Sequence, residues 1–191
     1  HTPYAAWVPQ PVSIGDLGNY REIAGDMEDT ISGDPKELLL KGMEELGLGN
    51  DPSTLTVTFT LGGTTQWLKT YGEYFQQVFH DKLGVNVVVD QNEWGTFQSK
   101  TNSGDYQMAY MVWTIDYNDP YSMLEVMKST AGSVPTFWTN EEYDELLNQA
   151  SVEMDDQKRA ELMKEAEHLM LSEAPICPVI NEATVRYSYS Y

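Results

Sequence analysis

The chain has 191 residues, of which 41% are hydrophobic and 12% aromatic, so it is long enough to bury a sizeable core within the size of one domain. Its formal net charge is -19 at pH 7, with acidic residues spread along the sequence, which argues against a nucleic-acid or anionic-lipid partner. No run of about 18 or more apolar residues occurs, so no membrane-spanning helix is predicted.

The N-terminal residues 1–33 are rich in proline, glycine and aromatic residues and show no sustained periodicity. We expect an extended segment that wraps over the surface. Asp34 then stands directly before Pro35, a pair that is typical of a helix start, and apolar residues at helical spacing continue as far as Gly47. One short helix is predicted there.

The clearest strand is 54–61, where four threonines alternate with four apolar residues. From Trp67 onward, aromatic and apolar side chains recur at helical spacing until Gly84, which predicts a long helix. Residues 85–89 are β-branched and nearly all apolar, as in a strand that is covered on both faces. Strand, helix and strand together predict a right-handed crossover unit.

The next segments continue the alternation of helices and strands. A short helix is predicted at 94–99, and a second apolar strand at 106–113. The chain then breaks at 116–120, where turn-forming residues gather. Thr139 and Glu142 have the spacing of a capping box, which predicts that a helix begins beside them.

The last predicted elements are a long helix and a strand. Asp155 is expected to open the helix, because apolar residues from Ala160 to Met170 line one face and charged residues the other. Residues 175–180 are predicted to form the final strand. The alternation along the whole chain predicts an α/β fold, with a sheet layered by helices.

Cysteine and histidine are too sparse to indicate a metal or redox centre. The single cysteine, Cys177, excludes an internal disulfide and lies in the apolar run of the last strand, where a buried packing role is expected. His1, His80 and His168 are far apart and have no second ligand at metal-binding spacing. We therefore expect no metal site and no cofactor.

Several strings resemble one known family when they are taken together and in order. They are Leu-Gly-Val-Asn-Val at 83–87, Glu-Trp at 93–94, Gly-Asp-Tyr at 104–106 and Trp-Thr-Ile-Asp-Tyr-Asn-Asp-Pro at 113–120. This order is similar to that of the oligopeptide-binding and dipeptide-binding proteins, the extracellular solute-binding proteins of ABC importers. The resemblance continues downstream and covers most of the chain from Pro35 onward.

The resemblance implies one lobe of a type-II periplasmic-binding-protein-like fold, with a mixed sheet flanked by helices. Members of the family have two lobes, and the chain is similar to the C-terminal one. Residues 1–191 would then form a single lobe, with the extended segment at 1–33 and an α/β core at 34–184. Residues 185–191 would cross over towards a second lobe.

The resemblance also implies a ligand site. In the family, the tryptophan and aspartate of a W-x-x-D motif line the cleft, and here they are Trp113 and Asp116. The aspartate pairs with the free α-amino group of a peptide, through a charge-assisted hydrogen bond. Main-chain groups from Val112 to Thr114 would bind the peptide backbone as an added strand.

Aromatic residues are the candidate walls of hydrated side-chain pockets: Trp67, Trp94 and Tyr110. Some members of the family carry a basic residue at the position of Tyr110, so the preferred peptide length is expected to differ here. On pattern alone, Trp113 would more often belong to a core, and Asp116 to an ordinary turn. For Trp67 and Trp94, a core position is as compatible with the pattern as a cleft position.

The function implied by the resemblance is peptide capture for ABC-type import, by a monomer that hands its ligand to a membrane permease. The protein would act at the outer face of the membrane, lipid-anchored or in the periplasm. No nucleophile elbow, phosphate loop or metal-binding helix motif points to an enzyme. The open alternatives are another ligand, namely a nickel chelate, haem or an oligosaccharide, and a stand-alone interaction module.

Overall fold

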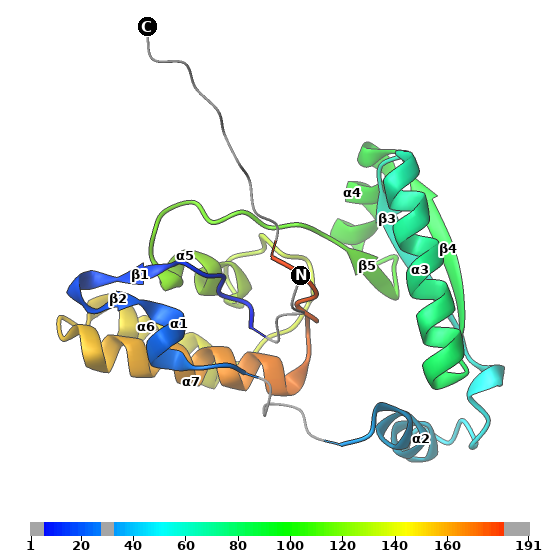
Figure 1. Cartoon of the computed structure of the whole chain (residues 1–191), viewed down its shortest axis with the longest axis horizontal. Coiled ribbons are helices and arrows are strands. Elements are labelled where there is room, and N and C mark those ends of the chain that lie inside the picture. The colour runs from blue at the N-terminus through cyan, green and yellow to red at the C-terminus, as the bar shows by residue number, and fades with distance from the viewer. Residues whose placement is uncertain (1–5, 28–32, 182–191) are drawn as a thin grey trace, which may run out of the picture. The chain divides into compact units, whose positions relative to one another are not determined.

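The computed structural model describes residues 6–27 and 33–181 (Figure 1). The chain divides into two compact units, the first formed by His1–Ile31 with Thr114–Tyr191 and the second by Ser32–Trp113. The core therefore has two parts, while the prediction that residues 1–191 form a single lobe stays a prediction. Within the described ranges, no helix combines the length and the apolar character that crossing a membrane would require.

The second unit is built around a parallel sheet. In chain order it contains α2 (Pro35–Glu45), η3 (Pro52–Thr54), β3 (Thr56–Gly62), α3 (Gln66–Leu83), β4 (Asn86–Asn92), α4 (Trp94–Ser103) and β5 (Met108–Tyr110). The strand order is β4-β3-β5, and β3 runs parallel to both neighbours. Strands joined through helices confirm the predicted α/β class.

The core of the second unit lies on the two longer strands. Phe59 and Leu61 of β3 are buried together with Val87 of β4. Thr60 is buried as well, so the end of β3 is covered on both faces. In β4, by contrast, Val88 is 51% exposed. The prediction of a strand covered on both faces is wrong for β4, because it lies at the edge of the sheet and only the side of Val87 is covered.

Helix α3 approaches the sheet closely at Gly72. A Cβ atom at this position would lie 2.9 Å from side-chain atoms of both Leu61 and Val89, so only glycine fits without a shift. The helix ends as predicted at Gly84, which adopts φ 78° and donates its N–H to the carbonyl of His80.

The other helices of the second unit follow their sequence signals, but the last strand is shorter than predicted. The Asp34 carboxylate caps α2, and α4 continues beyond the expected 94–99 as far as Ser103. Strand β5 covers only part of the predicted 106–113. One reason is that the side-chain oxygen of Gln107 accepts the main-chain N–H of Thr58 at 2.8 Å, and so replaces a strand-to-strand bond.

The first unit is mainly helical. It contains β1 (Ser13–Ile14), η1 (Gly15–Leu17), β2 (Gly18–Asn19), α1 (Tyr20–Ala24), α5 (Pro120–Leu124), η4 (Glu125–Met127), α6 (Glu141–Val152) and α7 (Asp156–Glu173). Strands β1 and β2 pair antiparallel in a small ribbon. Helix α7 packs against α6, α1 and α5, so it is the centre of this unit (Figure 1).

The described part of the N-terminal segment is more structured than the expected surface-wrapping segment at 1–33. Val8, Ile14 and Tyr20 are fully buried. The cause is a carboxylate on α7, Glu167, which is itself fully buried and accepts four hydrogen bonds. Its donors are Trp7 N (2.9 Å), Val8 N (2.9 Å), the Tyr20 hydroxyl (3.2 Å) and Arg21 Nη2 (2.5 Å).

The starts of α6 and α7 are fixed by side-chain caps. Asn140 caps α6 by accepting the N–H of Tyr143 at 3.0 Å, so the predicted capping role of Thr139 is wrong by one position. An asparagine in the extended conformation is as good a cap as threonine, which explains the displacement. Asp155 caps α7 as predicted.

The C-terminal residues depart from the prediction. Residues 175–181 form no strand, because none of the described strands pairs with them and a strand needs a neighbour for its hydrogen bonds. Cys177 is exposed rather than buried, so the expected packing role is wrong. The predicted crossover at 185–191 lies outside the described residues.

Candidate functional site

The carboxyl ends of the parallel strands bring several of the predicted site residues to one edge of the sheet. Leu61 of β3 lies opposite Tyr110 of β5, and Gly62 lies opposite Asn92 of β4. The strands therefore end side by side, and Trp94 follows β4 within two residues. Ligands of open α/β sheets bind beyond the carboxyl ends of the strands.

Trp67 and Tyr110 belong to one aromatic group at this edge. The ring of Trp67 lies 6.4 Å from that of Tyr110 and 6.1 Å from that of Tyr71, and the two tyrosine rings are 4.8 Å apart. Trp67 is 53% exposed, so it is a surface ring and not a core residue. Tyr71 was not predicted for the site, although its position one helical turn after Trp67 was a usable signal.

Trp94 forms a second aromatic group. Its ring stacks on that of Phe97 at 5.4 Å with 25° between the planes, and 55% of Trp94 remains exposed. Gly62 allows this arrangement, since a Cβ atom there would lie 2.7 Å from the Phe97 ring and 3.0 Å from Trp94. Trp94 therefore offers one face of a ring that is supported from behind by a fully buried phenylalanine.

The segment after β5 has unused main-chain groups. Residues 111–115 adopt no regular structure, and the main-chain groups of Val112, Trp113 and Thr114 bind no other group in the described part of the chain. Val112 is 55% exposed, and Thr114 is exposed too. Trp113 is half-buried, and its buried indole N–H has no hydrogen-bond partner among the described residues. Free main-chain groups of this kind are able to bind an extended peptide.

Asp116 lies in the first unit, in the loop that leads to α5. Its side chain is exposed, and within residues 6–27 and 33–181 no donor contacts its carboxylate. Its main-chain N–H donates to the hydroxyl of the buried Ser122 at 3.0 Å. The carboxylate is thus carried by an anchored backbone and accessible to a cation from outside the chain.

Two neighbours of Asp116 tie the loop to other parts of the first unit. The side-chain oxygen of Asn118 accepts the N–H of Ser13 at 3.1 Å, and the hydroxyl of Tyr117 donates to Glu125 at 2.7 Å. Burial raises the pKa of Tyr117, and the Glu125 carboxylate raises it further, so the hydroxyl keeps its proton and remains a donor.

An ion pair that was not predicted closes the loop. Asp119 accepts two hydrogen bonds from the guanidinium of Arg159, at 2.7 and 2.8 Å, and also caps α5 by accepting the N–H of Tyr121 at 2.8 Å. The position of Asp119 before a proline was a signal for the cap. No sequence signal predicts that its partner is Arg159, 40 residues further along the chain.

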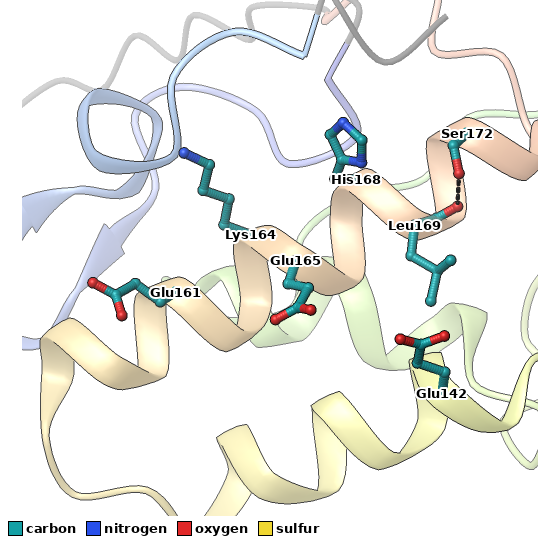
Figure 2. A pocket seen from close by; sticks show the side chains of 7 residues that line it. All are labelled: Glu142, Glu161, Lys164, Glu165, His168, Leu169 and Ser172. Carbon is teal, nitrogen blue, oxygen red and sulfur yellow. Dashed lines mark hydrogen bonds between the residues drawn. The ribbon is translucent and has the colours of Figure 1, made fainter.

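A hollow of about 370 Å³ lies elsewhere in the first unit, between α6 and α7. Figure 2 shows Glu142 and Glu165 pointing into the space between the helices, and Lys164 and His168 on the other side of α7. The lining contains none of the predicted site residues. Over the described ranges, no three His, Cys, Asp or Glu residues are placed to hold a metal ion.

The fold is that of the type-II periplasmic-binding proteins, as a comparison with solved structures confirms. The chain superposes on the OppA protein of Haemophilus influenzae, solved in complex with the peptide RPPGFSPFR, with a TM-score of 0.81 and 19% identity. The match covers 95% of this chain and 34% of that one.

The family follows from the sequence. Residues 27–134, more than half of the chain, match the family described as bacterial extracellular solute-binding proteins, family 5 Middle. The chain belongs to this family, which confirms the predicted resemblance. It is 36% identical over 145 residues to the oligopeptide-binding protein OppA of Bacillus subtilis, and 34% identical over 177 residues to the dipeptide-binding protein DppE of the same organism.

The matches cover most of this chain but a smaller part of the relatives. They include 75% and 93% of the chain, yet only 26% of OppA and 32% of DppE. The chain therefore spans about a quarter to a third of the length of these relatives. Both are named for peptide binding.

Proposed function

We propose that this chain supplies part of the peptide-binding surface of a solute-binding protein that serves an ABC importer. The observation that carries the proposal is the Asp116 carboxylate, which is exposed, has no donor within the described residues and sits in an anchored loop. Membership of a solute-binding family and relatives named for peptide binding support the same ligand class.

Asp116 would pair with the free amino group of the peptide. A carboxylate and an ammonium form a charge-assisted hydrogen bond, which is about twice as strong as a neutral one. The unused main-chain groups from Val112 to Thr114 would bind the peptide backbone, which every peptide shares, so recognition would depend little on sequence.

The exposed rings would form the walls of side-chain pockets. Trp67 and Trp94 each present a partly exposed ring, and Tyr110 packs within the group of Trp67. Trp113 would contribute its indole N–H, which has no partner among the described residues. Tyr110 is not a basic residue, so no cation at this position would bind a peptide carboxylate, and the preferred peptide length would differ from that of family members with a basic residue there.

In the whole protein, the chain would act as the C-terminal lobe, and closure of two lobes would trap the peptide before a membrane permease receives it. The protein would work as a monomer at the outer face of the membrane, lipid-anchored or in the periplasm. It would perform no chemistry itself. The family description, which places its members outside the cell, supports this location.

The test is calorimetric titration of the full-length protein with a pool of short peptides, followed by the variant Asp116→Ala. The variant should lose about 1.5 to 3 kcal/mol of binding free energy for peptides with a free amino terminus, as for a lost hydrogen bond to a charged group. N-acetylated peptides should lose much less. An equal loss for both would exclude amine pairing by Asp116.

Exposed aromatic rings also suit the flat faces of sugars, so oligosaccharides form the second arm of the titration. Binding of sugars without binding of peptides would replace peptide by oligosaccharide as the ligand class. Nickel chelates and haem complete the panel.

A further inference from the structure

The loop that carries Asp116 is held by one contact that differs from all the others. The side chains of Asp119 and Arg159 are only 20% and 18% exposed, and they meet through two parallel hydrogen bonds. The other contacts of the loop are single hydrogen bonds, such as those made by the Asp116 N–H and by Asn118. A two-bonded guanidinium fixes the direction of its carboxylate as well as its distance.

Arg159 connects the loop to two helices at once. It belongs to α7, and its Nε atom donates to the carbonyl of Ala150 in α6 at 3.1 Å. Asp119 in turn starts α5, through its bond with the N–H of Tyr121. The Asp119–Arg159 pair thereby links the position of the loop to the packing of α6 against α7, in addition to the contacts that the loop's own residues make.

We propose that Asp119 and Arg159 are positioning residues, which set the direction of the Asp116 carboxylate and so determine how strongly a free amino terminus is preferred. The inference rests on the proposed peptide-binding function. Its physical basis is that a charge-assisted hydrogen bond needs a defined distance and angle. If the carboxylate lay on a flexible, exposed loop, the loop would have to become ordered when the peptide binds, and the free-energy cost of this ordering would lower the affinity.

The measured quantity is a ratio of affinities in the full-length protein. The peptide of the pool that binds most tightly is titrated with a free and with an acetylated amino terminus. Asp119→Asn keeps a side-chain oxygen that can cap α5 but removes the charge, and Arg159→Gln removes the other partner. In both variants the preference for the free amino terminus should fall about tenfold.

A structural role alone would give a different result, because general loosening lowers both affinities and leaves their ratio unchanged. Lys100→Gln is the control, since it removes a more exposed ion pair, with Asp90 in the second unit. This control should keep the ratio. Thermal unfolding of each variant shows that it is folded. If Asp119→Asn is too unstable to titrate, Arg159→Lys provides a second test. This variant keeps the positive charge but cannot form the two parallel hydrogen bonds of the guanidinium, so it should still lower the ratio.

Two outcomes would overturn the inference, and they differ from each other. Folded Asp119→Asn and Arg159→Gln proteins that keep the wild-type ratio would show that the pair does not position Asp116. A wild-type protein that binds no peptide would refute the proposed function itself, and the positioning role would be refuted with it.

Discussion

Different kinds of interaction stabilise the interior of each of the two units. The second unit is continuous in sequence, and its core consists of apolar and aromatic side chains on a parallel sheet. The first unit joins two distant stretches of chain, and polar groups make the join: four donors from residues 7–21 meet the buried carboxylate of Glu167. Because the two stretches of the first unit are joined by hydrogen bonds to a buried carboxylate, a substitution that removes this carboxylate should strongly destabilise the unit.

The difference has a functional side. In the second unit, the candidate site residues are rings at the edge of the sheet, placed by ordinary strand ends. In the first unit, the candidate side chain is the Asp116 carboxylate, and its loop is held by an ion pair. Rings at a rim suit broad contact with many side chains, whereas a fixed carboxylate suits one defined group.

The largest expected effect is at Glu167. Glu167→Ala should lower the free energy of unfolding by about 3 to 5 kcal/mol, because it leaves the buried Arg21 guanidinium without its partner. Urea denaturation followed by tryptophan fluorescence measures the change. The control is Glu165→Ala on the same helix, an exposed position where the change should stay within about 0.5 kcal/mol. Equal effects of the two variants would mean that the hydrogen bonds to Glu167 do not stabilise the first unit.

The second unit is tested at its closest packing contact. Gly72→Ala should lower the free energy of unfolding by about 1 to 2 kcal/mol, because the added Cβ atom would press on Leu61 and Val89. The same substitution at Gly42 of α2, where nothing lies within 4 Å, should raise it by about 0.5 to 1 kcal/mol. Thermal unfolding measures the change in stability of both variants. An increase for both would show that the side chains of Leu61 and Val89 can move to accommodate the added Cβ atom.

The same contrast explains what the sequence could predict of the fold. Strand β3 and helix α3 have clear periods, and β4 begins in a β-branched apolar run. The three elements are neighbours in sequence, so local patterns were sufficient to find them. The N-terminal segment has no such period. Its order comes from contacts with a residue 146 to 160 positions away, which no local pattern reveals.

For the site, residue types could be predicted from the sequence, but their surroundings could not. The family strings pointed to Trp113 and Asp116, and the structure shows that Asp116 is exposed without a donor in the described residues. Helical spacing could not decide whether Trp67 was core or surface, because the answer depends on where the sheet ends. The partnership of Asp119 with Arg159 was missed because both residues are common at helix starts and on helix faces.

A smaller effect, and one of opposite sign to the losses at Glu167 and Gly72, is expected at the end of α7. Ala174 adopts φ 53°, a left-handed conformation that costs a residue with a Cβ atom about 1 to 2 kcal/mol. Ala174→Gly should therefore raise the free energy of unfolding by about 1 kcal/mol, since glycine is the preferred residue at such a helix end. Ala131 has no positive φ, and Ala131→Gly should lower stability slightly. A gain in both variants would point to an effect unrelated to backbone strain.

The smallest expected effect is a pH dependence in the second unit. Asp90 accepts a hydrogen bond from Lys100 at 2.6 Å, and this bond is the main reason why the pKa of Asp90 is lower than its ordinary value of 3.8. A lowered pKa in the folded state stabilises the protein above the ordinary value, and this contribution is lost as the pH falls through the lower, folded-state pKa.

Because both side chains are about 30% exposed, screening by solvent should limit the contribution to about 0.2 to 1 kcal/mol. Urea denaturation of the wild type and of Asp90→Asn at a series of pH values from neutral to acid measures it as the difference between the two curves. The curves should approach each other as the pH falls below the ordinary pKa of 3.8 and converge only below the lower, folded-state pKa. If the difference between them were as large as the loss expected for Glu167→Ala, the second unit would depend on a charge as strongly as the first, and the contrast between the units would disappear.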